Sequence, residues 1–153
     1  MRNKVSIVTL NNKFIKFPLI SLFSGILMGL APAPFNAWYF AWFALTPLWI
    51  LVRQQKFWLN LAIIALAWGV GYDGLALFWI TGVHPLTWMG VPWLASLAIA
   101  IFCWVFITLW GAGVVVVWSF LLNFFSHKVE SKNLFGSLSI VLLGTAFWCG
   151  LET

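Results

Sequence analysis

The sequence predicts an all-α integral membrane protein, built as a polytopic helical bundle of about five transmembrane helices. Of its 153 residues, 63% are hydrophobic and only 7% are charged, whereas about 25% of the residues of a soluble domain are charged. Several apolar runs are long enough to cross a bilayer, which takes roughly 20 residues of helix. The basic residues lie in short polar segments beside these runs, so we attribute them to membrane topology and expect no nucleic-acid partner.

Prolines and charges divide the apolar sequence into separate helices. The uncharged run 17–52 is too long for one span and is broken at 31–36, Ala-Pro-Ala-Pro-Phe-Asn, where two prolines remove amide donors and disfavour helix in the residues before them. Basic residues interrupt the apolar pattern at 53–56, a turn-rich loop follows at 83–93, and a polar segment occupies 126–133. We therefore expect a basic cytoplasmic N-terminus at 1–16 and a transmembrane helical domain over 17–153, with spans at about 14–30, 35–52, 57–82, 94–125 and 134–153.

The distribution of positive charge predicts the orientation of the chain. Segment 1–16 carries four basic residues and no acid, and the other basic residues are Arg53, Lys56, Lys128 and Lys132. With alternating spans, all of them lie on one side of the membrane, and the two loops on the opposite side carry none. Because positive charge is enriched on the cytoplasmic side, we expect a multi-pass protein with a cytoplasmic N-terminus.

A cleaved signal peptide is the alternative for the first apolar segment. The segment has a basic start, an apolar core at 19–30 and Ala31-Pro32-Ala33 as a small-x-small cleavage site. However, Pro34 would follow the cut directly, and a second apolar segment begins at once. These two features favour a retained membrane helix.

The two cysteines do not predict a metal site. Cys103 and Cys149 both fall inside apolar runs, without a CxxC pattern and without neighbouring ligand residues. We interpret them as free thiols that act as small apolar side chains, and we expect neither a disulfide nor a bound metal. We also expect no cofactor.

Asp73 is the residue that most needs an explanation. It lies within an otherwise apolar stretch, Trp-Gly-Val-Gly-Tyr-Asp-Gly, and a carboxylate in the bilayer interior costs roughly 2.5 to 3.5 kcal/mol on insertion scales. About 24 Å of helix separate it from Phe57, which puts it in the outer part of the bilayer. Two interpretations stay open: the carboxylate lies at the mouth of a lipid groove, or it is packed between Gly71 and Gly74 and is protonated or paired within the bundle.

Three further residues near the outer end of the third span are candidates for a lipid groove. Trp79 and Trp88 could line the entrance for an acyl chain, and His84 could titrate near neutral pH. The alternative for the two tryptophans is anchoring at the membrane interface, where Trp is enriched. For His84 the alternative is an ordinary interfacial loop histidine.

The order of several motifs resembles a known family. Leu-Ala-Pro-Ala-Pro-Phe-Asn-Ala-Trp is followed by Leu-Thr-Pro-Leu, then by Trp-Gly-Val-Gly-Tyr-Asp-Gly and Phe-Trp-Ile-Thr-Gly, and later by Trp-Cys-Gly-Leu-Glu. This series resembles the membrane portion of bacterial apolipoprotein N-acyltransferases. His-Pro-Leu-Thr-Trp-Met-Gly-Val-Pro-Trp is similar to cyanobacterial members in particular, and the likeness extends from about Ser21 to the end of the chain.

The resemblance implies a function for the longer protein. Family members move an acyl chain from a phospholipid to the N-terminal diacylglyceryl-cysteine of a lipoprotein, through a thioester on a catalytic Cys assisted by Glu and Lys. They have eight membrane helices and a nitrilase-like domain outside the bacterial inner membrane. This chain resembles only the first five helices, so we expect a truncated membrane domain that lacks the C-terminal helices and the catalytic domain. We assign no catalytic residue to it and expect the chain by itself to be inactive.

Two other classes of function remain open from the sequence. The chain could be a small non-enzymatic membrane protein, such as a transporter or channel subunit, although it has no repeat of broken helices in matching halves, which transporters often show. It could also be a membrane anchor for a separately encoded enzyme.

Overall fold

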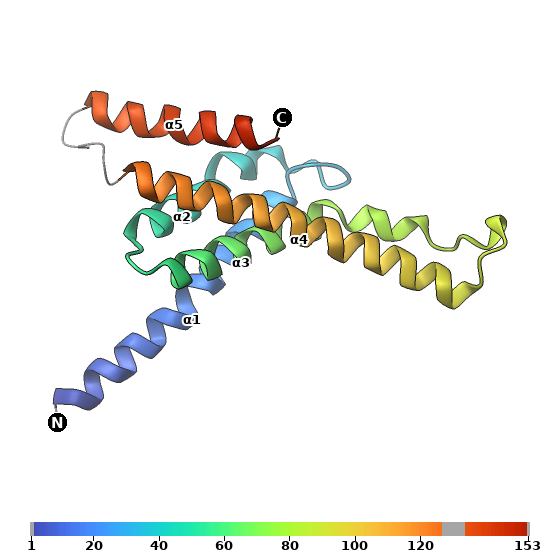
Figure 1. The fold of residues 1–153 in the computed structure, drawn as a ribbon, viewed down its shortest axis with the longest axis horizontal. Helices are drawn as coiled ribbons and strands as arrows, with labels where there is room; N and C mark the ends of the chain where they lie inside the picture. Colours follow the sequence, from blue (N-terminus) through green and yellow to red (C-terminus); the bar gives the residue numbers. More distant parts are fainter. Residues whose placement is uncertain (1, 127–133, 153) are drawn as a thin grey trace.

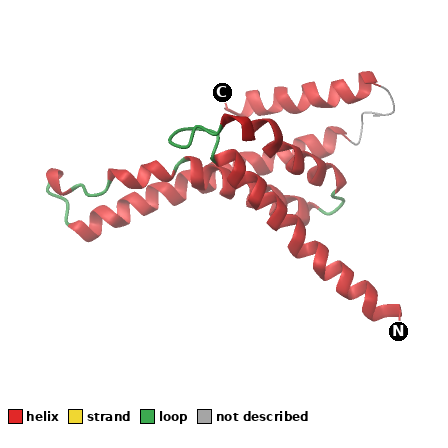
Figure 2. Cartoon of the chain, turned by 180° about the vertical axis from the view of Figure 1, so that it is seen from behind, coloured by secondary structure: helices red, strands yellow, loops and turns green. Residues whose placement is uncertain are grey.

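The computed structural model describes residues 2–126 and 134–152, with side chains at 15–126 and 136–151. Within these residues all regular secondary structure is helical (Figures 1 and 2), which confirms the expected fold class. The α-helices are α1 (Arg2–Gly29), α2 (Ala41–Gln54), α3 (Trp58–Ala76), α4 (Trp93–Ser126) and α5 (Leu134–Glu152), and the short 3₁₀ helices are η1 (Trp38–Phe40), η2 (Phe78–Val83) and η3 (Thr87–Met89).

Three helices differ in extent from the expected spans. Helix α1 begins at Arg2 rather than near residue 14, so the basic N-terminal segment 1–16 is helical over its described part. Helix α2 begins at Ala41 rather than at 35, because the turn after Leu30 continues to Ala37, whose N–H bonds to the Leu30 carbonyl at 3.0 Å. Asn36 has a positive φ of 53° within this turn, a conformation that ends regular helix.

The expected span 57–82 is an α-helix only to Ala76 and continues as the 3₁₀ helix η2. The Ile80 N–H bonds to the Leu77 carbonyl, three residues back, at 3.0 Å. The Thr81 hydroxyl donates to the Phe78 carbonyl at 2.7 Å. Such local side-chain bonds compete with the i→i−4 pattern of an α-helix. Gly82 and Pro85 favour the end of η2.

Helix α4 organises the molecule. In Figure 1 it runs along most of the length of the structure, with α5 beside its C-terminal half and η2 beside its N-terminal half. Among the described helices, α3 and α4 are long and apolar enough to cross a membrane, with mean hydropathies of 1.4 and 2.4 over their most apolar windows. Only 22% of that window of α4 is buried, whereas the core helix of a soluble protein would be mostly buried. Exposed apolar helices of this kind are consistent with the expected membrane protein.

The core lies where α2, α3, α4 and α5 meet. Its largest fully buried side chains are Trp68 and Trp118, and Trp148 of α5 packs edge-on against both rings at centroid distances of 6.3 and 5.5 Å. The indole N–H groups of the two buried rings are satisfied by carbonyl oxygens of other helices: Trp68 donates to Ala44 at 3.2 Å and Trp118 donates to Gly144 at 2.8 Å. Such bonds link helices inside a membrane, where water cannot supply a partner.

Candidate functional site

Helices α1 and α3 are in direct backbone contact. An ideal Cβ at Gly71 of α3 would lie 2.6 Å from the Leu22 carbonyl oxygen of α1, and one at Gly25 of α1 would lie 2.9 Å from the Trp68 carbonyl carbon. The buried hydroxyl of Ser21 adds a hydrogen bond of 2.7 Å to the Ile64 carbonyl. Small residues allow membrane helices to approach this closely, so the Gly25-x-x-x-Gly29 spacing of α1 serves helix packing.

Helices α3 and α4 also approach closely through small residues. A Cβ at Gly69 would lie 2.5 Å from the Ala112 Cα atom. At the next level along the pair, Gly111 of α4 lies against the carboxylate of Asp73, and a Cβ at Gly111 would come within 2.7 Å of the Asp73 Cγ atom. The carboxylate therefore occupies the space that the missing side chain of Gly111 leaves free.

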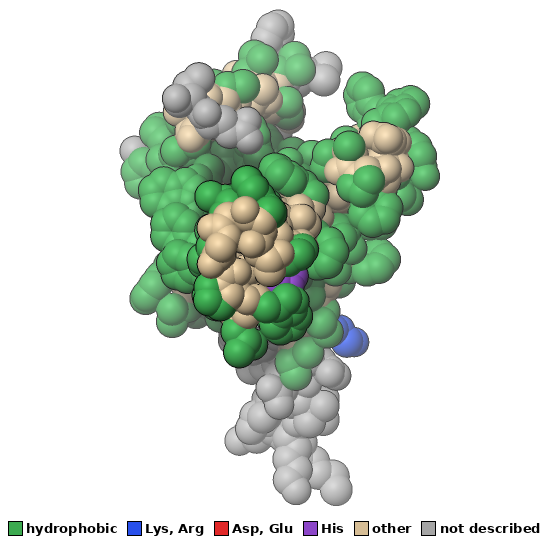
Figure 3. All heavy atoms as spheres, turned by 90° about the vertical axis from the view of Figure 1, so that its right-hand side faces the viewer, with side chains coloured by type: hydrophobic (Ala, Val, Ile, Leu, Met, Phe, Trp, Pro, Cys, Tyr) green, Lys and Arg blue, Asp and Glu red, His purple; other side chains and the backbone are tan. Residues whose placement is uncertain are grey.

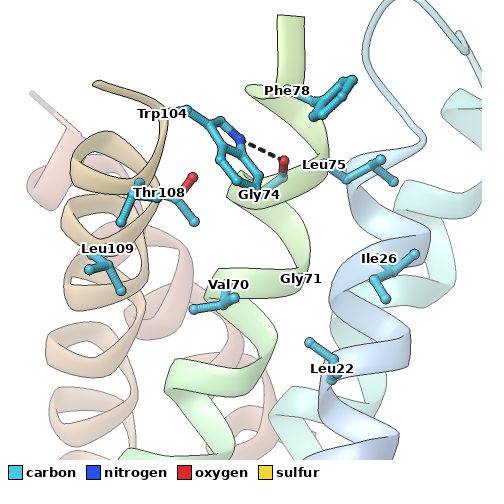
Figure 4. A pocket seen from close by; sticks show the side chains of 11 residues that line it. Leu22, Ile26, Val70, Gly71, Gly74, Leu75, Phe78, Trp104, Thr108 and Leu109 are labelled. Carbon is cyan, nitrogen blue, oxygen red and sulfur yellow. Dashed lines mark hydrogen bonds between the residues drawn. The ribbon is translucent and has the colours of Figure 1, made fainter. Parts of the chain in front are cut away.

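An apolar groove lies between α1, α3 and α4 beyond these close contacts (Figure 4). It has a volume of about 500 Å³, within the range of roughly 300 to 1,000 Å³ that is usual for ligand sites. Figure 4 shows α3 at its centre, with α1 and α4 forming the two walls. The residues that line it are Leu22, Ile26, Val70, Gly71, Gly74, Leu75, Phe78, Trp104, Val105, Thr108 and Leu109.

Two polar groups lie on the α4 side of this groove. The Trp104 indole N–H donates to the Gly74 carbonyl at 3.0 Å. The Thr108 side chain is only 6% exposed, and its Oγ1 atom has no hydrogen-bond partner among the described residues. Figure 4 shows this oxygen pointing to the end of the groove where Trp104 and Gly74 lie. A buried hydroxyl without a partner costs roughly 1 to 3 kcal/mol, and this one lies in the wall of the groove.

The four residues that we expected at a lipid groove do not line this one. Asp73 is on α3 beside it, with its carboxylate next to Gly111 of α4. Trp79, His84 and Trp88 lie beyond the end of α3, in η2, the following loop and η3. From the sequence, Gly74 was named only as a neighbour of Asp73, and Trp104 and Thr108 were not singled out. The only feature of the sequence that could have indicated this groove was the pair Trp104 and Thr108, an indole and a hydroxyl within an otherwise apolar span.

The segment that carries Trp79, His84 and Trp88 is held to the start of α4. His84 Nδ1 and the Ser96 hydroxyl are 2.9 Å apart, the Leu86 N–H donates to the same hydroxyl at 2.8 Å, and the His84 ring packs edge-on against Trp93 at 5.1 Å. Trp79 and Trp88 are 64% and 79% exposed. The view of this end in Figure 3 shows mostly hydrophobic side chains, a surface typical of contact with lipid or with other apolar helices.

Comparison with known proteins identifies the family. Residues 24–153 match the family model described as the apolipoprotein N-acyltransferase N-terminal domain. The chain is 47% identical over 140 residues to the apolipoprotein N-acyltransferase of Synechocystis sp., covering 82% of this chain and 27% of that protein. It is 49% identical over 130 residues to that of Nostoc sp., covering 82% and 25%, and 34% identical to that of Gloeobacter violaceus, covering 88% and 24%.

No solved structure matches the chain significantly. The chain spans about a quarter of the length of the curated relatives it matches. The extent of the matching model and the identity to these relatives show that the chain belongs to the apolipoprotein N-acyltransferase family, within its N-terminal domain.

Proposed function

We propose that this chain is the membrane part of an enzyme that moves an acyl chain from a phospholipid to the N-terminal diacylglyceryl-cysteine of lipoproteins, and that the groove between α1, α3 and α4 holds one chain of a bound lipid. Family membership supports the reaction. The observation that carries the role of this chain is the groove itself. Its lining is almost entirely apolar, and its glycine floor lets a ligand lie against the backbone of α3.

The unpaired hydroxyl of Thr108 gives this groove a preference for the ester end of a lipid chain. Burial of apolar area contributes little to binding here, because lipid tails are already in an apolar solvent. Binding then depends on shape and on polar contacts. An ester carbonyl oxygen next to Thr108 Oγ1 would accept its hydrogen bond and remove the cost of the unsatisfied buried atom.

Asp73, Trp79, His84 and Trp88 form the approach to this site in the proposal. Asp73 is adjacent in sequence to Gly74, which lines the groove. Trp79, His84 and Trp88 lie between the end of α3 and the start of α4. The exposed indoles of Trp79 and Trp88 suit the membrane interface, where lipid headgroups lie. The chain supplies no catalytic residue in this proposal. The acyl-transfer chemistry belongs to further helices and a nitrilase-like domain that would be its partners.

The proposed location is the bacterial inner membrane, with the N-terminus in the cytoplasm. The connection between α2 and α3, with Arg53 in the last turn of α2 and Lys56 in the connection itself, lies at the same end of the molecule as the end of α4 and the start of α5 (Figure 1). The loop 83–93 lies at the opposite end and has no basic residue. A tag in this loop should be labelled by an impermeant reagent from outside intact cells. Labelling only after the cytoplasm is opened would refute the orientation.

A photocrosslinking experiment tests the groove. The full chain is purified into bilayer nanodiscs that contain a phospholipid with a diazirine on one acyl chain, and crosslinked peptides are mapped by mass spectrometry. Gly74→Leu should remove most labelling of the groove residues, because the nearest atom to a Cβ at this position is Thr108 Cγ2 at 3.7 Å and a longer side chain extends into the groove. Gly113→Leu is the matched control, since no atom lies within 4 Å of a Cβ there.

The outcomes are distinct. Labelling concentrated on the groove peptides, reduced several-fold in Gly74→Leu and retained in Gly113→Leu, supports the proposal. Labelling spread evenly over the lipid-facing helices, or unchanged in Gly74→Leu, refutes it. The assignment to the enzyme is tested separately by replacing the matching quarter of the Synechocystis relative with this chain. The hybrid should N-acylate lipoproteins, and an inactive but stably inserted hybrid would contradict the assignment.

A further inference from the structure

A second pocket lies at the end of the molecule where α2 passes into α3. Its volume is about 370 Å³, and α4 closes one side of it. The Asn123 side-chain amide of α4 donates to the Val52 carbonyl at 2.7 Å and to the Gln55 carbonyl at 3.2 Å, which fixes α4 against the connection. The residues that line the pocket are Gln55, Lys56, Phe57, Trp58, Leu61, Phe120, Asn123 and Phe124.

The charge at this pocket is positive and is not neutralised within the described structure. Lys56 lines the pocket and is exposed, and Arg53 lies in the last turn of α2 just before it. Neither side chain forms an ion pair with the described residues. Asp73 is the only acid with a described side chain, and it lies roughly 22 Å further along α3 at 1.5 Å per residue. An anion at this pocket would therefore meet Lys56, with Arg53 three residues before it in the chain, and no described carboxylate.

The first turn of α3 adds unpaired donors at the same place. The residue before the helix, Phe57, makes no side-chain capping bond, and the first turn contains no acidic residue. The first amide groups of an α-helix have no partner inside the helix, and the helix dipole favours negative charge beside them. A phosphate group is a suitable ligand for such a helix start.

Gln55 provides an independent indication that a ligand belongs here. Its side chain lines the pocket and is only 9% exposed, yet it makes no hydrogen bond to any described residue. The amide is not among the polar side-chain atoms that are fully buried without a partner, so it is open to the pocket, where the oxygens of a polar headgroup would supply a hydrogen-bond partner. The aromatic side chains of Phe57, Trp58 and Phe124 are 71%, 66% and 56% exposed beside the same pocket, where they can pack against an acyl chain at the membrane interface.

We propose that this pocket binds the headgroup of an anionic phospholipid from the leaflet that faces the basic end of the molecule. The phosphate lies against Lys56 and the first turn of α3, Gln55 bonds to headgroup oxygens, and an acyl chain runs along Phe120 and Phe124. The site is separate from the groove between α1, α3 and α4, because the two share no lining residue. It serves as a structural lipid site, so it does not depend on acyl transfer.

The full chain, taken from nanodiscs of phosphatidylcholine that contain phosphatidylglycerol, tests the proposal by native mass spectrometry of the retained lipid. The chain should retain phosphatidylglycerol in preference to phosphatidylcholine. Lys56→Gln should lower the retained phosphatidylglycerol about fivefold, the effect of one basic residue near an anionic membrane surface. Lys16→Gln is the matched control, since it removes one exposed positive charge outside the pocket and should leave retention unchanged. An excess of inorganic phosphate should not displace the lipid.

Three results would overturn the proposal. Equal losses in Lys56→Gln and Lys16→Gln would mean that the lipid is held by diffuse charge rather than by the pocket. Equal retention of phosphatidylcholine would mean that the headgroup charge is not recognised. Displacement by inorganic phosphate would mean that the site takes free phosphate rather than a lipid.

Discussion

Replacing Gly71 by Ala tests the backbone contact between α1 and α3. The added Cβ would lie 2.6 Å from the Leu22 carbonyl oxygen and 3.0 Å from the Ile26 amide nitrogen. Both are backbone atoms of α1, so no flexible side chain can move aside, and the two helices must separate. Overpacking of a tight interface costs typically 1 to 3 kcal/mol. In the opposite direction, Ala is favoured over Gly inside a helix by about 1 kcal/mol.

Gly74→Ala separates these two effects. Gly74 is one turn further along the same helix, so the change in helix propensity is similar, but its added Cβ makes only an ordinary contact of 3.7 Å with Thr108 Cγ2. The difference in unfolding free energy between the two variants therefore measures the steric term alone. We expect Gly71→Ala to be less stable than Gly74→Ala by about 1 to 3 kcal/mol.

Reversible unfolding of the purified chain in mixed micelles, driven by increasing fractions of SDS and followed by tryptophan fluorescence, measures this difference. A fall of 1.4 kcal/mol corresponds to about a tenfold change in the folded-to-unfolded ratio. Gly113→Ala provides the baseline, because its Cβ meets no atom within 4 Å. If Gly71→Ala unfolds at the same SDS fraction as Gly74→Ala, the helices are not in contact as described and the reasoning fails.

Three further substitutions test contacts of α4. Trp118→Phe removes the indole donor to a carbonyl of α5 and should destabilise the chain by about 1 kcal/mol in the same SDS titration, whereas Trp110→Phe, at a side chain that is 71% exposed, should not. Asn123→Ala removes both bonds to the end of α2 and should accelerate tryptic cleavage in the α2–α3 connection, and an unchanged cleavage rate would count against this role. Gly111→Ala displaces the Asp73 carboxylate and should lower stability by about 1 to 3 kcal/mol, while Asp73→Asn, with nearly the same shape, should stay within about 0.5 kcal/mol of the native chain.

The class of fold and the positions of the breaks between helices follow from the sequence because they depend on local chemistry. Composition predicts membrane helices, and the prolines at 32 and 34 predict the turn that follows α1. The end of α3 was predicted less well. The apolar residues 77–80 suit an α-helix as well as a 3₁₀ helix, so they did not indicate the change to η2, to which the Thr81 hydroxyl contributes.

The groove could not be predicted because it depends on how three helices diverge in space. Gly25 and Gly29 indicate close packing, but the sequence does not name the partner that meets them, which is α3. The same applies to Asp73. The sequence left open a position at the mouth of a lipid groove or packing between Gly71 and Gly74 within the bundle, and it could not name Gly111 of α4, which lies next to the carboxylate. In the sequence, Thr108 is one threonine in an apolar run and indicates nothing by itself. It indicates a site only in the structure, where its hydroxyl is buried without a partner among the described residues.

The two close contacts of α3 also limit how the groove can change. At Gly71 the backbone of α1 lies so close that α3 has no room to rotate about its axis. If α4 rotated about its own axis by one residue at Gly111, Trp110 or Ala112 would enter the space that the carboxylate of Asp73 fills. Both walls of the groove are thus packed directly against α3 at their base. In the proposed lipid site, a longer or shorter acyl chain would require different side chains at the rim, so differences in acyl-chain preference among relatives should be sought at Leu75, Phe78 and Trp104.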